Sequence, residues 1–206
     1  MDFFSRLMEK SINIKKSDIK FYEVSYDKIP EIPDGEYKEV KIESCIDVKV
    51  DFNASKIKLS VFLEDVNYME YLDIKYLNDS EKLIIQVLAK KEIEHGYIKV
   101  ILPELEKFEV VSKYSDLKIN RAYADEISIS TNSGDVVASI DMTRYAKIVS
   151  DSGDILLKTK NKMFKIDATS KNGDVIWNNI KSNRKSNDEI KIFSKNGDVQ
   201  VKLMSE

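Results

Sequence analysis

Apolar and polar residues alternate with a period of two through most of the chain from Tyr37 onward. In the first half the alternating runs cover residues 40–42, 46–52, 57–63, 72–76, 83–87 and 98–102. This alternation predicts half-buried β-strands, and turn-forming segments such as Asn78-Asp79-Ser80 separate them. After residue 14 the only expected helix lies near residues 66–71. The pattern therefore predicts an irregular, strand-rich part over residues 37–104.

The second half repeats one short motif of a small residue or asparagine, then glycine, aspartate and a β-branched residue. Its glycine and aspartate pairs are Gly134 and Asp135, Gly153 and Asp154, Gly173 and Asp174, and Gly197 and Asp198. A fifth copy carries Ser115 in the glycine position, so the successive spacings are 19, 19, 20 and 24 residues. Apolar pairs recur at fixed distances on both sides of every copy. Each repeat is therefore predicted to be a strand, a tight structural corner and a second strand.

Two all-β architectures fit this repeat: a meander of hairpins, and a β-solenoid in which equivalent strands stack in parallel. We favour a solenoid with about five corner-bearing rungs over residues 105–206, since a rung cannot bury its inner face alone. Stacking in sequence order places Val136 beside Ile155, and Ile155 beside Val175. Gly153 is expected in a left-handed conformation. The hydroxyl residues three positions before each glycine position are expected to form a hydrogen-bonded ladder. Residues 37–206 then form one domain.

Residues 1–36 are expected to form a short N-terminal helix and an extended lead-in. Phe3, Phe4, Leu7 and Met8 recur at helical spacing, and charged residues occupy the other side. We expect this amphipathic helix to cap the solenoid, and docking on a partner or a membrane surface is the alternative. A transmembrane segment and a secretory signal are not apparent. The expected location is cytoplasmic, or peripheral to the envelope.

Composition argues against several kinds of chemistry. The formal net charge is −3, and only four of the 33 basic residues are arginine, which disfavours a nucleic-acid partner. One cysteine, Cys45, and one histidine, His95, offer no catalytic pair. The corner aspartates supply one carboxylate per rung, too few to enclose Ca²⁺, so they are expected to accept backbone hydrogen bonds. We therefore predict no catalytic, cofactor-binding or metal-binding residues.

A few side chains outside the repeat suit contacts with a partner. Tyr68 and Tyr71 are predicted contact residues together with Phe3, Phe4 and Leu7, although burial is the commoner fate of tyrosine. Trp177 falls on an inward position and is expected in the core. A polar insertion near residues 178–187 contains the Lys-rich segment 181–185, which is expected to form a solvated loop able to contact an acidic partner.

The four corners, together with the segments 46–50 and 97–104, resemble the bacterial putative-adhesin β-solenoid family, a family of domains of unknown function. The resemblance covers roughly residues 38–206. It implies a β-helix-like fold and no catalytic residues.

These observations predict a non-catalytic binding or scaffolding module, adhesin-like or associated with the envelope. Its partner would be a protein or an extended glycan, and a homo-oligomer could form through a solenoid end or the N-terminal helix. The alternative is an intracellular regulatory or stress-response module that binds a partner protein. A carbohydrate-active enzyme on a β-helix is the third hypothesis.

Overall fold

The chain folds into an all-β structure, and the computed structural model describes residues 19–204. Two short 3-10 helices, η1 (Tyr26–Lys28) and η2 (Val66–Tyr71), accompany the strands. The helix expected near residues 66–71 is thus confirmed. The strands are β1 (Tyr22–Glu23), β2 (Glu39–Ser44), β3 (Asp47–Phe52), β4 (Lys58–Leu63), β5 (Leu72–Asp79), β6 (Lys82–Ala89), β7 (Gly96–Leu102), β8 (Leu105–Ser112), β9 (Leu117–Ser133), β10 (Val136–Met142), β11 (Tyr145–Ser152), β12 (Ile155–Thr159), β13 (Lys165–Ser170), β14 (Val175–Asn178), β15 (Glu189–Ser194) and β16 (Val199–Leu203).

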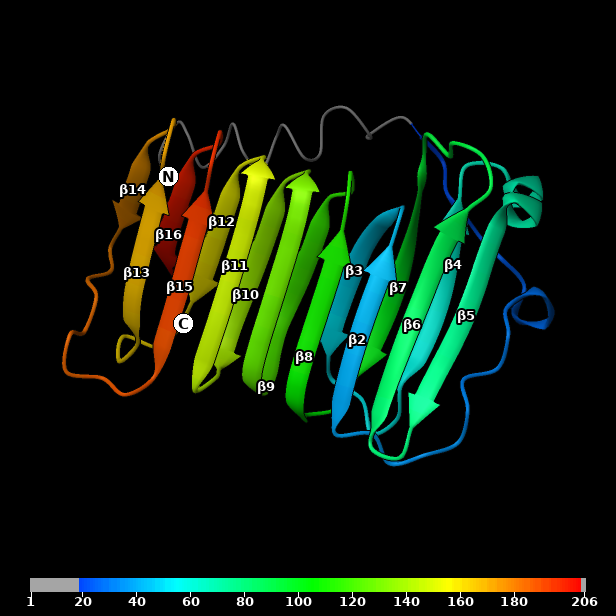
Figure 1. Cartoon of the computed structure of the whole chain (residues 1–206), viewed down its shortest axis with the longest axis horizontal. Helices are drawn as coiled ribbons and strands as arrows, with labels where there is room; N and C mark the ends of the chain where they lie inside the picture. The colour runs from blue at the N-terminus through cyan, green and yellow to red at the C-terminus, as the bar shows by residue number, and fades with distance from the viewer. Residues whose placement is uncertain (1–18, 205–206) are drawn as a thin grey trace.

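The strands form two facing layers, which Figure 1 shows one in front of the other. Sheet A has the order β1-β4-β7-β3-β9-β10-β12-β16-β14. Sheet B has the order β5-β6-β2-β8-β9-β11-β15-β13. The long strand β9 belongs to both layers, because its first residues pair in sheet A and its later residues pair in sheet B.

Strand pairing in the second half is parallel, so the hairpin meander is excluded. Val136 pairs with Leu117 on one side and with Ile155 on the other, as the solenoid hypothesis requires. The inner faces of the two layers carry the alternating apolar residues, and these form one continuous buried core. Parallel strands with a recurring inner face are typical of a solenoid-like coil.

The stacking order differs from the sequence order at the C-terminal side. Ile155 pairs with Val199 rather than with Val175, because β15 and β16 lie between the preceding strands and β13 and β14. The prediction that Ile155 lies beside Val175 is therefore wrong.

Side-chain volume explains this transposition. The inward residues of β15 and β16 are Ile190, Ile192, Val199 and Val201, all buried. Those of β13 and β14 include the small Ala168, which pairs with Ile192, and the large Trp177, which pairs with Val201. Burial of apolar area therefore favours β15 and β16 in the interior of the stack and leaves β13 and β14 at its end.

The first half joins the same stack and contains a second transposition. Strands β2 and β3 pair in parallel with β6 and β7 on one side and with β8 and β9 on the other. At this end of the molecule β4 and β5 add antiparallel to β7 and β6, and β1 adds to β4. The two ends are called here the β4/β5 end, at the right of Figure 1, and the β13/β14 end, at its left. Residues 19–204 contain no helix with the length and apolar character that a membrane crossing requires.

Candidate functional site

The interior of the solenoid opens to solvent at the β13/β14 end. Trp177 pairs with Val201, an inward residue that is fully buried. The indole therefore points to the same side as the core residues, but 39% of its surface is exposed because β14 is the last of the described strands in sheet A. The prediction of a core tryptophan is right about its direction and wrong about its burial.

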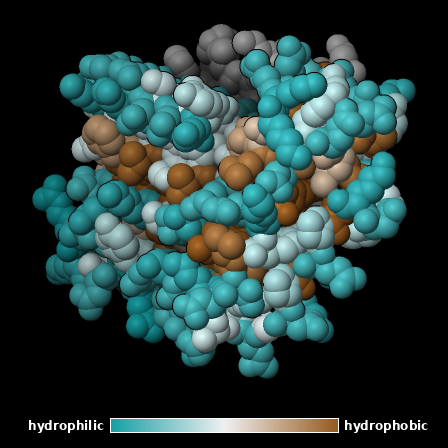
Figure 2. All heavy atoms as spheres, turned by 45° about the vertical axis from the view of Figure 1, so that its right-hand side comes forward, coloured by the Kyte–Doolittle hydropathy of each residue, from teal (hydrophilic) through white to brown (hydrophobic). Residues whose placement is uncertain are grey.

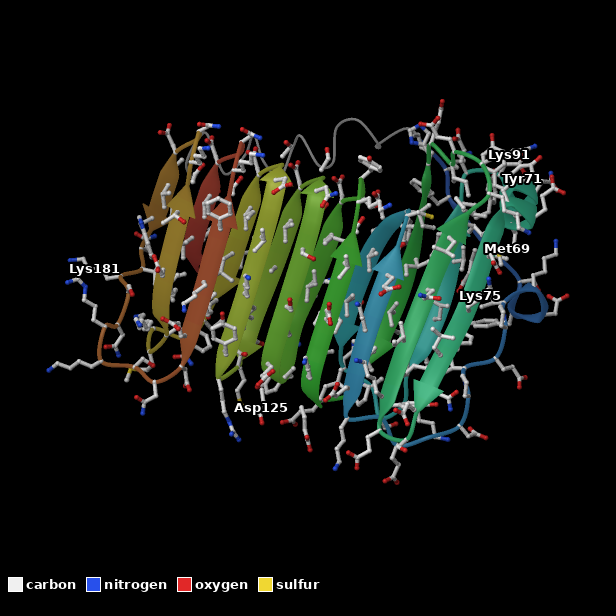
Figure 3. All side chains as sticks on the ribbon, viewed as in Figure 1. Met69, Tyr71, Lys75, Lys91, Asp125 and Lys181 are labelled. Carbon is white, nitrogen blue, oxygen red and sulfur yellow. The ribbon has the colours of Figure 1, made fainter. Side chains whose placement is uncertain are left out.

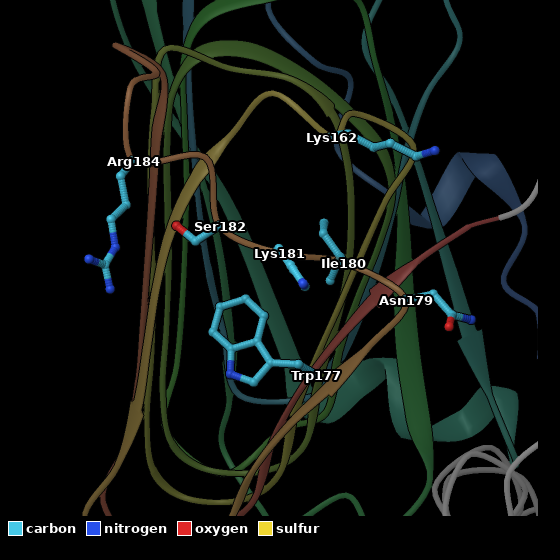
Figure 4. Close-up of a pocket in the computed structure, with 7 residues that line it drawn as sticks. All are labelled: Lys162, Trp177, Asn179, Ile180, Lys181, Ser182 and Arg184. Atoms are coloured by element: carbon cyan, nitrogen blue, oxygen red, sulfur yellow. The ribbon is translucent and has the colours of Figure 1, made fainter.

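A groove of about 800 Å³ surrounds this indole, and we call it the end groove. Its lining consists of Lys162, Trp177, Asn179, Ile180, Lys181, Ser182 and Arg184. Figure 4 shows the indole inside the outline of the coil with Lys181 beside it, whereas Lys162 and Arg184 lie at opposite rims. The segment expected as a solvated loop thus lines the open end of the core.

Backbone and side-chain hydrogen bonds fix this loop against the preceding turn. The Ser182 hydroxyl accepts a bond of 2.9 Å from the backbone N–H of Ile166, and the Asn183 N–H donates to the Phe164 carbonyl at 3.0 Å. Ile180 and Phe164 are both buried and close the core beneath the groove. The groove therefore has a packed apolar floor and a polar, cationic rim.

The charge of the end groove is of one sign. Lys162, Lys181 and Arg184 line it, and none of the described residues in its lining is acidic. Within residues 19–204, the ion pairs that form involve other basic residues. A chain of net charge −3 thus gathers three cations around its only tryptophan. Such a surface favours an anionic ligand with a flat apolar face.

The corner aspartates lie in one continuous ladder of hydrogen bonds. Except at the last member, Asp174, the Oδ1 atom of each carboxylate accepts a bond from the backbone N–H of the aspartate in the next rung, at distances between 2.8 and 3.0 Å. In stacking order the members are Asp47, Asp116, Asp135, Asp154, Asp198 and Asp174. Asp47 was not predicted, because its corner is one residue shorter and has no glycine position. Each carboxylate therefore has a structural task in positioning the neighbouring corner.

The environment of the ladder disfavours ionisation at its centre. Burial raises the pKa of Asp135, and the neighbouring carboxylates Asp116 and Asp154 raise it further. The hydrogen bond from the Asp154 N–H acts in the opposite direction. In the described part of the chain, no group of three or more His, Cys, Asp or Glu side chains is placed to hold a metal ion.

The glycine corners stack so closely that a side chain would not fit between them. A Cβ atom on Gly153 would lie 2.1 Å from the carbonyl oxygen of Gly134, and one on Gly197 would lie 2.1 Å from that of Gly153. Gly153 does not have the left-handed conformation that we expected; only Gly134 has a positive φ, 138°, among the described glycines. Close approach of backbones, rather than a special φ, is the reason for glycine at position 153.

The expected hydroxyl ladder connects hydroxyls to backbone groups rather than to each other. The hydroxyls of Ser170 and Ser194 each accept a bond of 2.9 Å from the glycine N–H three residues later. Ser170 also donates to the Gly197 carbonyl at 2.7 Å, and Ser194 donates to the Gly153 carbonyl at 3.2 Å. These bonds link adjacent corners and fix their spacing.

Two of the predicted contact residues, Tyr68 and Tyr71, lie far from the end groove. Tyr68 and Tyr71 lie on η2 at the β4/β5 end, with ring centroids 6.3 Å apart, and Lys91 Nζ is 4.3 Å from the centre of the Tyr71 ring. Figure 3 shows Tyr71 and Lys91 at one extreme of the molecule and Lys181 at the other. Phe3, Phe4 and Leu7 lie outside the described residues.

The β4/β5 end also has a pocket, which is more apolar. It occupies about 380 Å³ between the lead-in segment and strands β4 and β5, and it is lined by Tyr26, Ile29, Pro30, Glu31, Ile32, Ile57, Lys58, Leu59 and Tyr76. Burial raises the pKa of Tyr76 to about 12. Figure 2 brings this end forward and shows an apolar band between hydrophilic rims. Its single lysine and single glutamate give it no excess of either charge.

Sequence reasoning missed the end groove because its residues come from separate segments. Lys162 and Asn179 carry no motif, and Arg184 belongs to the insertion that was expected to be solvated. The signal in the sequence was the longest spacing between corners, 24 residues, which marks the loop that now lines the groove.

A solved structure of a bacterial protein shares this fold. A putative cell adhesion protein from Clostridium sporogenes has a TM-score of 0.64 at 14% identity, and the match covers 90% of this chain and 98% of that chain. A putative adhesin from Bacteroides fragilis matches at 13% identity over 90% of this chain and 97% of that one, with a TM-score of 0.37. At these identities, only the fold of the clostridial protein is informative for this chain.

Among curated proteins, no sequence matches this chain. The family model described as Toastrack DUF4097 matches residues 6–206, nearly the whole sequence. The resemblance to a family of domains of unknown function is confirmed by this match, and the clostridial structure supports the fold. The chain belongs to the Toastrack DUF4097 family.

Proposed function

We propose that this protein is a non-catalytic binding module and that its end groove binds an anionic glycan. The observation that carries the proposal is the exposed Trp177 indole in a groove whose described lining has three basic side chains and no acidic one. The scaffold for this site is a single solenoid domain over residues 37–206, with about five corner-bearing rungs.

The lining of the groove fits the chemistry of an acidic sugar. The flat face of an indole packs well against the C–H face of a pyranose ring. Lys162, Lys181 and Arg184 can bind carboxylate or sulfate groups, and Asn179 and Ser182 can hydrogen-bond to hydroxyls. A volume of about 800 Å³ lies within the usual range for a small-ligand site, roughly 300–1,000 Å³.

A glycan is favoured over an acidic peptide because the donors of the groove are side chains. A peptide bound to the edge of β14 would add a strand through backbone hydrogen bonds. That strand is only four residues long, and the indole and Lys181 lie inside the outline of the coil. Stacking and side-chain donors therefore offer more contact than strand addition does.

The absence of acidic residues from the groove lining also favours binding over turnover. Glycoside hydrolysis needs a pair of carboxyl groups on opposite sides of the bond that is cleaved. The lining residues between positions 19 and 204 supply no carboxyl group for either role. The groove is thus suited to retaining a ligand.

Trp177 gives a direct assay, because it is the only tryptophan of the chain. We expect trigalacturonate, the anionic probe, to change the tryptophan emission in a saturable way that added salt weakens. Maltotriose, the neutral probe, should have little effect. Replacing Lys181 and Arg184 by glutamine should weaken trigalacturonate binding by about 5- to 25-fold, since each exposed ion pair contributes up to about 1 kcal/mol. Lys90→Gln, at the opposite end, is the matched control and should leave binding unchanged.

Equal responses to the anionic and neutral probes would contradict the proposal, and so would unaltered binding by the double variant. Stronger competition by a tetra-aspartate peptide than by trigalacturonate would identify a peptide as the ligand instead. Chromatographic detection of shortened oligosaccharides after incubation would overturn the non-catalytic assignment.

A further inference from the structure

The outer face of sheet A contains side chains that are buried although they point away from the core. In β12, Ile155 and Leu157 face the core, so Leu156 between them points outward by the alternation of a strand. Only 4% of Leu156 is exposed, and only 2% of its neighbour on β16, Gln200. On the outer face of sheet B, by contrast, Phe193 is 40% exposed. Some part of the chain must therefore cover Leu156 and Gln200.

The strands of residues 19–204 cannot provide this cover, because each of them belongs to sheet A or sheet B. Met204 accounts for one neighbour, Ser139, whose hydroxyl lies 3.9 Å from its sulfur atom. Leu156 and Gln200 belong to a different row of paired residues across the sheet, in which Leu156 pairs with Val137 and Gln200 pairs with Ile176. Beyond the described range the chain has residues 1–18 and the dipeptide Ser-Glu at 205–206, and only the former carries apolar side chains.

The described chain begins on the correct face for such a cover. The Phe21 ring lies 5.3 Å from the ring of Tyr97, which points outward from β7 and stacks on Phe62 at 4.7 Å. Five strand spacings separate β7 from β16 in sheet A. At about 4.8 Å each, these span roughly 24 Å. Eighteen residues in a helix span about 27 Å, which is sufficient to reach β16.

We propose that residues 1–18 lie across the outer face of sheet A and cover Leu156 and Gln200 with the apolar stripe Phe3, Phe4, Leu7 and Met8. In this proposal the amphipathic segment covers one face of the coil, which is an alternative to the end cap expected from the sequence. The stripe meets the apolar row of Val137, Leu156 and Ile176, while Arg6, Glu9 and Lys10 face solvent. The segment and the end groove lie on different surfaces, so this proposal does not depend on the ligand of the groove.

Thiol labelling tests this arrangement in the full-length protein. Cys45 is the only cysteine and is exposed, so the background is Cys45→Ser. A cysteine introduced by Leu156→Cys should react about 10-fold or more slowly with a maleimide than one introduced by Phe193→Cys, because covered thiols react only when the cover opens. Deleting residues 1–14 should bring the two rates together, and circular dichroism verifies that the truncated chain is folded.

Point variants separate loss of the cover from loss of the fold. Phe4→Asp combined with Leu7→Asp should expose the thiol at position 156 as the deletion does. Arg6→Ser combined with Glu9→Ser, on the solvent side of the same segment, should keep it protected. Rapid labelling at position 156 in the full chain would overturn the proposal, because nothing would cover that face. Continued protection after both the deletion and the Asp substitutions would overturn it as well, because another segment would then be the cover.

Discussion

Replacing Gly153 by alanine tests whether close backbone approach fixes the corners. The new Cβ would lie 2.1 Å from the Gly134 carbonyl oxygen, whereas non-bonded heavy atoms need about 3.5 Å. The adjacent corner must therefore move by roughly 1 Å or more. Both partners are backbone groups, so no side chain can rotate to relieve the clash.

The cost follows from the hydrogen bonds that this movement would stretch. The Gly134 N–H donates to Ser152 at 3.1 Å, and the Asp154 N–H donates to Asp135 at 2.9 Å. Each such bond contributes about 1 kcal/mol, and overpacking of a close contact costs about 1–3 kcal/mol. We expect Gly153→Ala to lower the free energy of unfolding by about 3 kcal/mol. At this chain length that corresponds to a fall in Tm of roughly 6–12 °C.

Two further variants distinguish the cause. Gly153→Asn should destabilise as much as alanine does, because the contact is steric; if a left-handed backbone were the reason for glycine, asparagine would be tolerated better. Gly35→Ala is the control, since its Cβ would meet only the end of the Tyr37 ring, at 2.8 Å, and should cost less than about 1 kcal/mol. Urea unfolding of Gly153→Ala within 0.5 kcal/mol of the wild type would refute the close-approach reasoning.

Three other predictions concern the ladder and the stacking order. Asp135→Asn keeps the acceptor for the Asp154 N–H and should be neutral or stabilising by about 1 kcal/mol at pH 7, whereas Asp135→Ala should lose about 1–2 kcal/mol in urea unfolding. Because the folded-state pKa of Asp135 is raised, its ionisation disfavours the folded state above that pKa. The difference in unfolding free energy between the wild type and Asp135→Asn should therefore vanish as the pH falls below the unfolded-state pKa, about 3.9. A difference that grows in acid would contradict this expectation. Added Ca²⁺ should leave the Tm unchanged, and a rise that scales with its concentration would show that the ladder binds metal. Truncation after Asp188 removes β15 and β16, the strands with which β13 and β14 pair. A protease should therefore degrade residues 165–188 rapidly. Resistance of that segment would show that β13 and β14 can pair directly with β11 and β12.

The local features of the fold could be predicted from the sequence, and the order of the strands could not. Alternation identified which residues face the core, and the spacing of the corners identified parallel stacking. The segments 170–175 and 194–199 are identical, Ser-Lys-Asn-Gly-Asp-Val, so the pattern cannot decide which one stacks on the corner at Gly153. That choice depends on how the flanking side chains pack.

The same ambiguity explains why the end groove could not be predicted. Trp177 is a core residue if another strand pair follows β14 in the stack, and a surface residue if none does. Its inward direction follows from local periodicity, whereas its exposure depends on which strands occupy the end of the stack. The basic residues around it line an open groove only because β14 lies at the end of the stack.

The transposed strands impose an order on folding as the chain is synthesised. A repeat array can normally add each unit to the one made just before it. Here β13 and β14 leave the ribosome before β15 and β16, on which they must finally pack, and β2 and β3 are likewise made before both of their neighbours. During synthesis, at about 5–20 residues per second, these segments have no native surface to join for a second or more. Their apolar residues therefore stay exposed to solvent during that interval.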